Sequence, residues 1–126
     1  MSYANAASAY RENAILTASA EKIVLLLYEG AIRHLERSRL FLSDPATVRS
    51  AQAGESIGRA LAIVSELRAS LDHNVGGEVS KSLERLYEFT EHQITQANIS
   101  RTPAPLESGL RVMRTLKEAW DVVIPH

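Results

Sequence analysis

Residues 23–28 form an uninterrupted apolar run, Ile-Val-Leu-Leu-Leu-Tyr, inside a longer segment, 19–42, whose pattern is typical of one helix. Its apolar residues recur at the spacing that keeps side chains on one helix face, at Val24, Tyr28, Ala31, Leu35 and Leu42. Ile23, Leu26 and Leu27 lie outside that stripe. They begin a second stripe, which continues toward Gly30 and His34. Because a surface helix needs only one apolar face, the second stripe requires cover from another helix or from a partner.

The rest of the sequence predicts three further helices, at 45–70, 78–97 and 105–123. The separators are Pro45, a glycine-containing turn at 72–77 and a loop at 98–105 that contains two prolines. Asn98 is expected to end the third helix, since asparagine tolerates a left-handed backbone. Trp120 is expected to anchor the core. Four helices joined by short turns predict an all-α fold, an antiparallel four-helix bundle, in one domain spanning 1–126.

Residues 1–16 are rich in small residues, with Tyr3 and Tyr10 as the only aromatic side chains. A short helix with two anchors is marginal in water unless it docks on something. We therefore expect a mobile or loosely docked N-terminal arm or short helix in addition to the bundle.

The composition excludes several classes of protein. The chain has no cysteine, so disulfides, thiol catalysis and thiolate metal sites are ruled out, and a cytoplasmic location fits. No apolar run approaches the roughly 20 residues that span a bilayer, and the N-terminus lacks the pattern of a secretory signal. Fourteen basic and fifteen acidic residues nearly cancel, so net charge predicts neither nucleic-acid binding nor attraction to a membrane surface.

No pattern of catalytic or metal-binding residues emerges. A di-iron site in a bundle needs Glu-x-x-His pairs, and none of the four histidines has a glutamate three residues before it. His34 invites comparison with phosphoacceptor histidines, but Glu36 nearby would repel a phosphoryl group, so a histidine at the surface or at a groove edge is favoured. We expect no enzyme, cofactor or metal. A histidine phosphotransfer-type signalling bundle and a plain dimerising helical bundle remain as alternatives.

The second stripe of 19–42 is the positive signal. Ile23, Leu26, Leu27 and Gly30 would form the floor of a groove that takes a helix or an extended peptide. Gly30 supports this interpretation because a glycine inside a helix often marks the close approach of another backbone. The alternative is that these residues pack against the last helix or against the N-terminal arm.

Two further residues have two interpretations each. Tyr87 serves either the core or the groove, and the core is favoured. Asn98 either caps its helix or bonds to the backbone of a partner, and the cap is favoured.

Several short stretches resemble the FliS family, the flagellar export chaperones for flagellin. Ala-Tyr at 9–10, Thr-Ala-Ser-Ala-Glu-Lys at 17–22 and Leu-Tyr-Glu-Gly-Ala at 27–31 are similar to the opening of that family. The resemblance continues in Leu-Asp at 71–72, Gly-Gly-Glu at 76–78, Leu-Tyr at 86–87 and Gln-Ala-Asn at 96–98, and ends at Trp120. It covers nearly the whole chain in order. Ala20 and Glu29 stand where many members have proline and aspartate.

The resemblance implies a cytoplasmic bundle that binds the disordered C-terminal segment of flagellin, prevents its premature polymerisation and assists its export. It further implies that the N-terminal arm occupies part of the groove, with Tyr10 as a displaceable plug. The residues expected to bind the partner are Tyr10, Ile23, Leu26, Leu27, Gly30, Tyr87 and Asn98. Contacts with the flagellar export gate and with a competing flagellar assembly factor are also implied, as is a monomer or weak homodimer.

Overall fold

The structure, a computed structural model, describes residues 18–123, all of whose regular elements are helices. They are α2 (Ala18–Ser43), α3 (Ala51–Ala69), α4 (His73–Ser100) and α5 (Ala104–Val123). The all-α prediction is confirmed. The predicted arm at 1–16, including Tyr10, lies outside the described residues. Within the described part, no helix is both long and apolar enough to cross a membrane.

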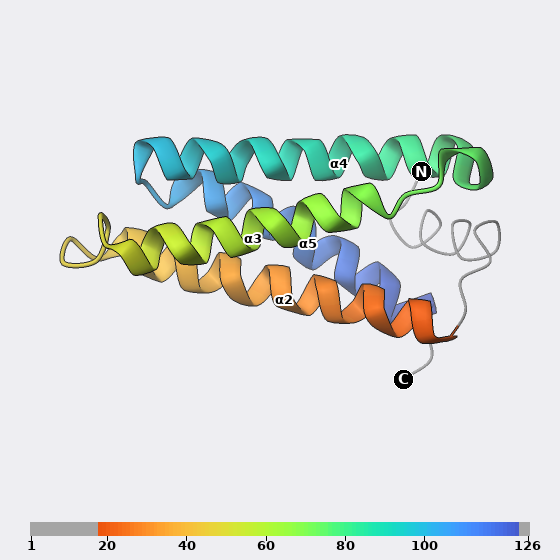
Figure 1. The fold of residues 1–126 in the computed structure, drawn as a ribbon, viewed down its shortest axis with the longest axis horizontal. Helices are drawn as coiled ribbons and strands as arrows, with labels where there is room; N and C mark the ends of the chain where they lie inside the picture. Colours follow the sequence, from red (N-terminus) through yellow and green to blue (C-terminus); the bar gives the residue numbers. More distant parts are fainter. Residues whose placement is uncertain (1–17, 124–126) are drawn as a thin grey trace.

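The four helices run along the long axis of the molecule, and each one reverses the direction of the one before it (Figure 1). α2 packs against α3 and α5, and α4 packs against the same two helices, so α2 and α4 face each other across the bundle. Short connections allow only such antiparallel neighbours. The predicted four-helix bundle is therefore confirmed.

The core stripe of α2 is where the sequence predicted it. Tyr28, Ala31 and Leu35 are fully buried, Leu42 is buried and Val24 is half-buried against the core. Hydrogen-bonded polar groups complete the inner face of α2: the buried Ser38 hydroxyl donates to the Ser56 hydroxyl of α3 at 2.9 Å. Because Ser38 and Ser56 are small, α2 and α3 approach closely at this level.

Three aromatic residues meet in the middle of the bundle. The hydroxyl groups of Tyr28 on α2 and Tyr87 on α4 are hydrogen-bonded to each other. The ring centroid of Trp120 on α5 lies 6.5 Å from that of Tyr28. Both tyrosines and Trp120 are buried, which confirms the predicted core position of Trp120. Burial raises the pKa of Tyr28 to about 12, although its hydrogen bonds to Tyr87 and Trp120 act in the opposite direction.

The start of α3 differs from the prediction, which placed it at Pro45. Residues 44–49 form turns, and the helix begins only at Ala51, where the Ser50 side chain accepts a hydrogen bond from the Ala53 backbone N–H. Before it, Asp44 accepts from the Ala46 N–H. These side-chain acceptors stabilise a turn that competes with an earlier helix start.

Both ends of α4 also differ from the prediction. The segment expected to be a turn contains one helical turn that starts at His73, and Gly77 then breaks the helix with φ 55° and ψ −126°. At the other end Asn98 does not close the helix, which continues to Ser100. Arg101 takes the left-handed conformation instead, with φ 53°, and its N–H donates to the Ala97 carbonyl at 2.8 Å. The predicted cap role of Asn98 is therefore wrong.

Tyr28 makes the stability of the fold sensitive to alkali. Its pKa of about 12 in the folded chain lies above the ordinary tyrosine pKa of 10.0, so the unfolded chain loses this proton first as the pH rises. The raised pKa of Tyr28 contributes roughly 2 to 3 kcal/mol to the free energy of unfolding. This contribution is fully present below pH 10 and is lost between about pH 10 and 12. Urea unfolding at pH 9 and pH 11.5 should therefore show a smaller alkaline loss in Tyr28→Phe than in the unchanged protein. Equal losses would contradict this assignment.

Two glycines predict opposite effects of the same substitution. Gly58 lies exposed in the interior of α3, and a Cβ atom there would meet no other atom within 4 Å. Gly58→Ala should raise the free energy of unfolding by about 1 kcal/mol, because alanine is the better helix former. Gly77→Ala should lower it by about 1 to 3 kcal/mol, because an L-residue is strained at its positive φ. Denaturant titrations followed by circular dichroism would measure the free energy of unfolding of both variants. Changes of the same sign in the two variants would contradict the prediction.

Candidate partner-binding surface

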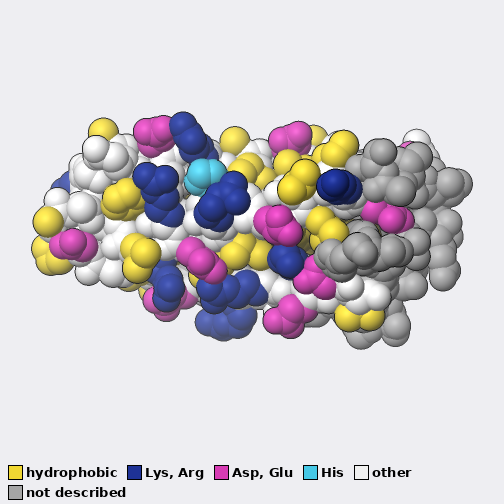
Figure 2. Space-filling model, turned by 90° about the horizontal axis from the view of Figure 1, so that it is seen from below, with side chains coloured by type: hydrophobic (Ala, Val, Ile, Leu, Met, Phe, Trp, Pro, Cys, Tyr) yellow, Lys and Arg dark blue, Asp and Glu magenta, His cyan; other side chains and the backbone are white. Residues whose placement is uncertain are grey.

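The second stripe of α2 lies beside α3, where much of it is open to solvent. The exposed fractions are 57% for Ile23 and 56% for Leu26, whereas Leu27 is half-buried against the core. Ile63 of α3 is also half-buried and faces the same boundary. We call Ile23, Leu26, Leu27, Gly30 and Ile63 the apolar strip. Hydrophobic side chains of this kind are visible on the face in Figure 2, toward the end where α2 begins.

Gly30 of α2 lies against the side chain of Ile63 of α3. A Cβ atom at Gly30 would lie 3.3 Å from the Cδ1 atom of Ile63. The neighbour at this glycine is a side chain of α3 in the same chain, and not the backbone that the sequence suggested. At Gly30 the stripe borders α3 rather than the last helix, and the alternative cover by the N-terminal arm lies outside the described residues.

The other residues expected to bind a partner lie elsewhere. Tyr87 is buried and hydrogen-bonded to Tyr28, as its favoured core interpretation predicted. Asn98 is exposed near the end of α4, and its backbone carbonyl accepts a hydrogen bond from Arg101 Nε at 3.0 Å. Neither residue adjoins the apolar strip, because α4 does not pack against α2.

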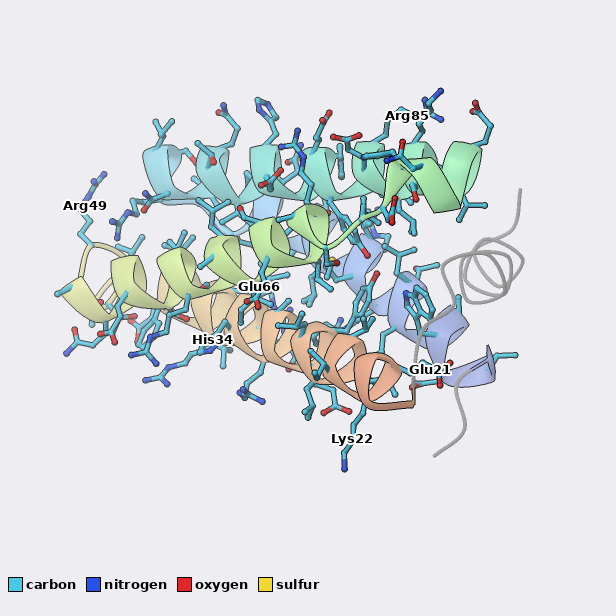
Figure 3. All side chains as sticks on the ribbon, turned by 45° about the vertical axis from the view of Figure 1, so that its right-hand side comes forward. Glu21, Lys22, His34, Arg49, Glu66 and Arg85 are labelled. Carbon is cyan, nitrogen blue, oxygen red and sulfur yellow. The ribbon has the colours of Figure 1, made fainter. Side chains whose placement is uncertain are left out.

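His34 lies half-buried at the edge between α2 and α3, next to basic side chains (Figure 3). Burial lowers its pKa, and the charges of Arg33, Arg59 and Arg37 lower it further. His34 and Arg37 also line a hollow of about 50 Å³ together with Gln52, Glu55, Ser56 and Arg59. The interpretation of His34 as a groove-edge residue therefore fits its position.

We call Arg33, Arg37 and Arg59 the arginine cluster. Sequence reasoning missed it, because Arg59 comes from a different helix and joins the other two only once α3 packs on α2. The sequence did show that Arg33 and Arg37 lie one turn apart on the same helix, which indicates that two of the three arginines are neighbours.

Elsewhere on the described surface, large exposed apolar side chains occur singly on three helices, at Leu40, Phe89, Ile99 and Val122. Isolated apolar residues are normal on protein surfaces and need no partner. The α3/α4 boundary instead carries an ion-pair network around Arg68, whose guanidinium bonds to Glu88 at 2.7 Å and to Glu91 at 3.0 Å. This network links two packed helices, so it has a structural role.

Comparison with known proteins gives a consistent result. The family model described as flagellar protein FliS matches residues 3–126. The chain belongs to the FliS family. A flagellar secretion chaperone FliS of Vibrio cholerae is 35% identical over 91% of this chain and 82% of its own length. The corresponding chaperone of Salmonella typhimurium is 31% identical over 90% of this chain and 83% of its own length. That of Bacillus subtilis is 25% identical over 98% of this chain and 90% of its own length.

Membership of the FliS family confirms the resemblance drawn from the short stretches of sequence. It also agrees with the prediction of a binding protein rather than an enzyme, since these relatives are named as chaperones. The family alone does not assign the apolar strip to any partner, and that assignment requires an argument from the surface itself.

Proposed function

We propose that this FliS-family chain is a cytoplasmic flagellar secretion chaperone that binds the disordered C-terminal segment of flagellin. By covering that segment it prevents premature polymerisation and assists export. The observation that carries the proposal is the apolar strip, where Ile23 and Leu26 remain more than half exposed beside α3. Membership of a family whose relatives are named secretion chaperones supports it.

The strip suits an amphipathic helix or an extended peptide. Such guests place apolar side chains against a groove at intervals of three or four residues, and Ile23, Leu26 and Leu27 repeat at the same intervals. A disordered segment loses about 2–5 kcal/mol or more in becoming ordered, so it must bury a long apolar surface to bind. An apolar burial of about 1,000 Å² contributes on the order of 25 kcal/mol gross, most of which association and ordering consume.

Within this proposal the residues of the site divide by position. Ile23 and Leu26 contact flagellin directly, and Leu27 supports them from its half-buried position. Gly30 lets α2 and α3 approach each other beneath the guest. Tyr87 acts through the core by holding Tyr28, and Asn98 offers an exposed amide to a longer guest.

Several finer expectations stay predictions of the family resemblance. They are the plug role of Tyr10, contacts with the export gate and with a competing assembly factor, and the monomer or weak homodimer.

Calorimetric titration with a peptide spanning the C-terminal segment of the flagellin from the same organism tests the proposal. We expect one-to-one binding with a large negative heat-capacity change, since apolar burial drives it. Ile23→Asp and Leu26→Asp should each weaken binding roughly ten- to a hundredfold, because each places a charge in an apolar contact. Both side chains are exposed, so circular dichroism should show an unchanged helix content.

Phe89→Asp is the matched control, because Phe89 is 42% exposed on α4, a helix that does not pack against α2, and is distant in sequence from Asn98. Leu27→Asp is less informative, since the half-buried Leu27 also packs on the core. Absence of binding by the unchanged protein would overturn the proposal. Equal losses in the Ile23 and Phe89 variants would move the site away from the strip, and a stable dimer that buries the strip would favour the dimerising-bundle alternative.

A further inference from the structure

The arginine cluster continues the apolar strip toward the carboxyl end of α2. Arg33 and Arg37 are exposed and one turn apart on α2, and Arg59 faces them from α3. Arg59 is paired with Glu55 at 2.6 Å. No carboxylate among the described residues lies within ion-pair distance of Arg33 or Arg37. The guanidinium of Arg37 instead stacks on the Phe41 ring at 5.5 Å. Two positive charges therefore remain uncompensated in a chain whose net charge is −1.

His34 lies within this local field. The charges that face it are Arg33 and Arg37 from α2 and Glu55 and Arg59 from α3. The three arginines lower its pKa in addition to burial. Its Nδ1 atom is also buried without a hydrogen-bond partner in the described part of the chain. The cationic end of the strip therefore disfavours a further positive charge.

On the other side of Gly30 from the arginine cluster, the strip is bordered by a charge of the opposite sign. α2 and α3 are antiparallel, with Gly30 level with Ile63, so Glu66, one turn further along α3, is level with Leu27. Figure 3 shows Glu66 and His34 along the boundary between these helices, whereas Lys22 points away from it. Glu66 is exposed and forms no ion pair with the described residues.

We propose that this charge asymmetry sets the direction of the bound segment: its helix lies along the strip parallel to α2, with its carboxyl end at the arginine cluster. The inference rests on the proposed function, since it takes flagellin as the guest. A helix carries partial positive charge at its amino end and partial negative charge at its carboxyl end. Only the parallel orientation places both ends near charges of opposite sign.

The strip and the cluster together also set the length of the guest helix. The distance from Leu27, which is level with Glu66, to Arg37 corresponds to about 10 residues, or roughly 15 Å at the rise of an α-helix. A guest helix of about three turns therefore reaches from Glu66 to the arginines. A shorter helix would leave one end without its complementary charge.

The direction can be measured directly because the chain has no cysteine, so a single introduced cysteine takes one nitroxide label. Gln52→Cys places the label at the arginine end, since Gln52 lines the hollow beside His34. Lys22→Cys places it at the other end of α2. With isotope-labelled flagellin C-terminal peptide, the label at 52 should broaden the NMR signals toward the carboxyl end of the strip-bound helix. The label at 22 should broaden those toward its amino end. The reverse pattern, or equal broadening from both labels, would overturn the inference.

Charge reversal tests the cause of the direction. Arg33→Glu with Arg37→Glu should weaken binding of the same peptide roughly three- to tenfold at low salt and reduce its salt dependence. The matched control is Arg85→Glu with Arg111→Glu, which makes the same change in net charge at exposed positions on α4 and α5.

The two proposals fail in different ways. If the peptide binds the unchanged protein with normal affinity but reversing the cluster has no more effect than the control, the inference about direction is wrong and the proposed function stands. If the unchanged protein does not bind the peptide, the proposed function is wrong, and the inference fails with it.

Discussion

The hydrogen bond between Tyr28 and Tyr87 determines how α2 is rotated in the bundle. α2 and α4 do not pack side by side, so long side chains must fill the space between them. Two buried hydroxyl groups are tolerated there because each satisfies the other, whereas an unpaired one would be costly. Once Tyr28 points inward, the helical repeat carries Ile23 and Leu26 roughly 140° and 160° around the axis from it. The exposed strip is therefore a consequence of the core.

Small residues then determine how near α3 comes to that strip. A Cβ atom on Gly30 would already touch Ile63 at 3.3 Å, and the hydroxyl of Ser56 reaches both Ser38 and the His34 carbonyl. Larger side chains at these positions would separate the helices and fill the boundary between them. Because the boundary is narrow, Ile23 and Leu26 stand beside it uncovered by α3.

Most of the fold could be predicted from periodicity, because α2 has a long and regular core stripe. The errors lie where side chains compete with the backbone. Pro45 suggested a helix start, but the caps at Asp44 and Ser50 stabilise a turn before α3. Asn98 suggested an end to α4, but the left-handed residue is Arg101, whose guanidinium also donates to the Val48 carbonyl at 3.2 Å. That contact joins two connections far apart in sequence, so no local pattern could reveal it.

Part of the candidate site could also be predicted from the sequence, and part could not. Ile23 and Leu26 could be predicted as a second stripe because they belong to one helix. The arginine cluster and Glu66 could not, because the alignment of α3 with α2 brings their charges to the strip. The two exposed side chains would contribute only roughly 2 to 3 kcal/mol on burial, which is less than the cost of association. A tightly bound flagellin segment must therefore extend beyond the strip, and charges that fix its direction determine which other surfaces of the bundle it can reach.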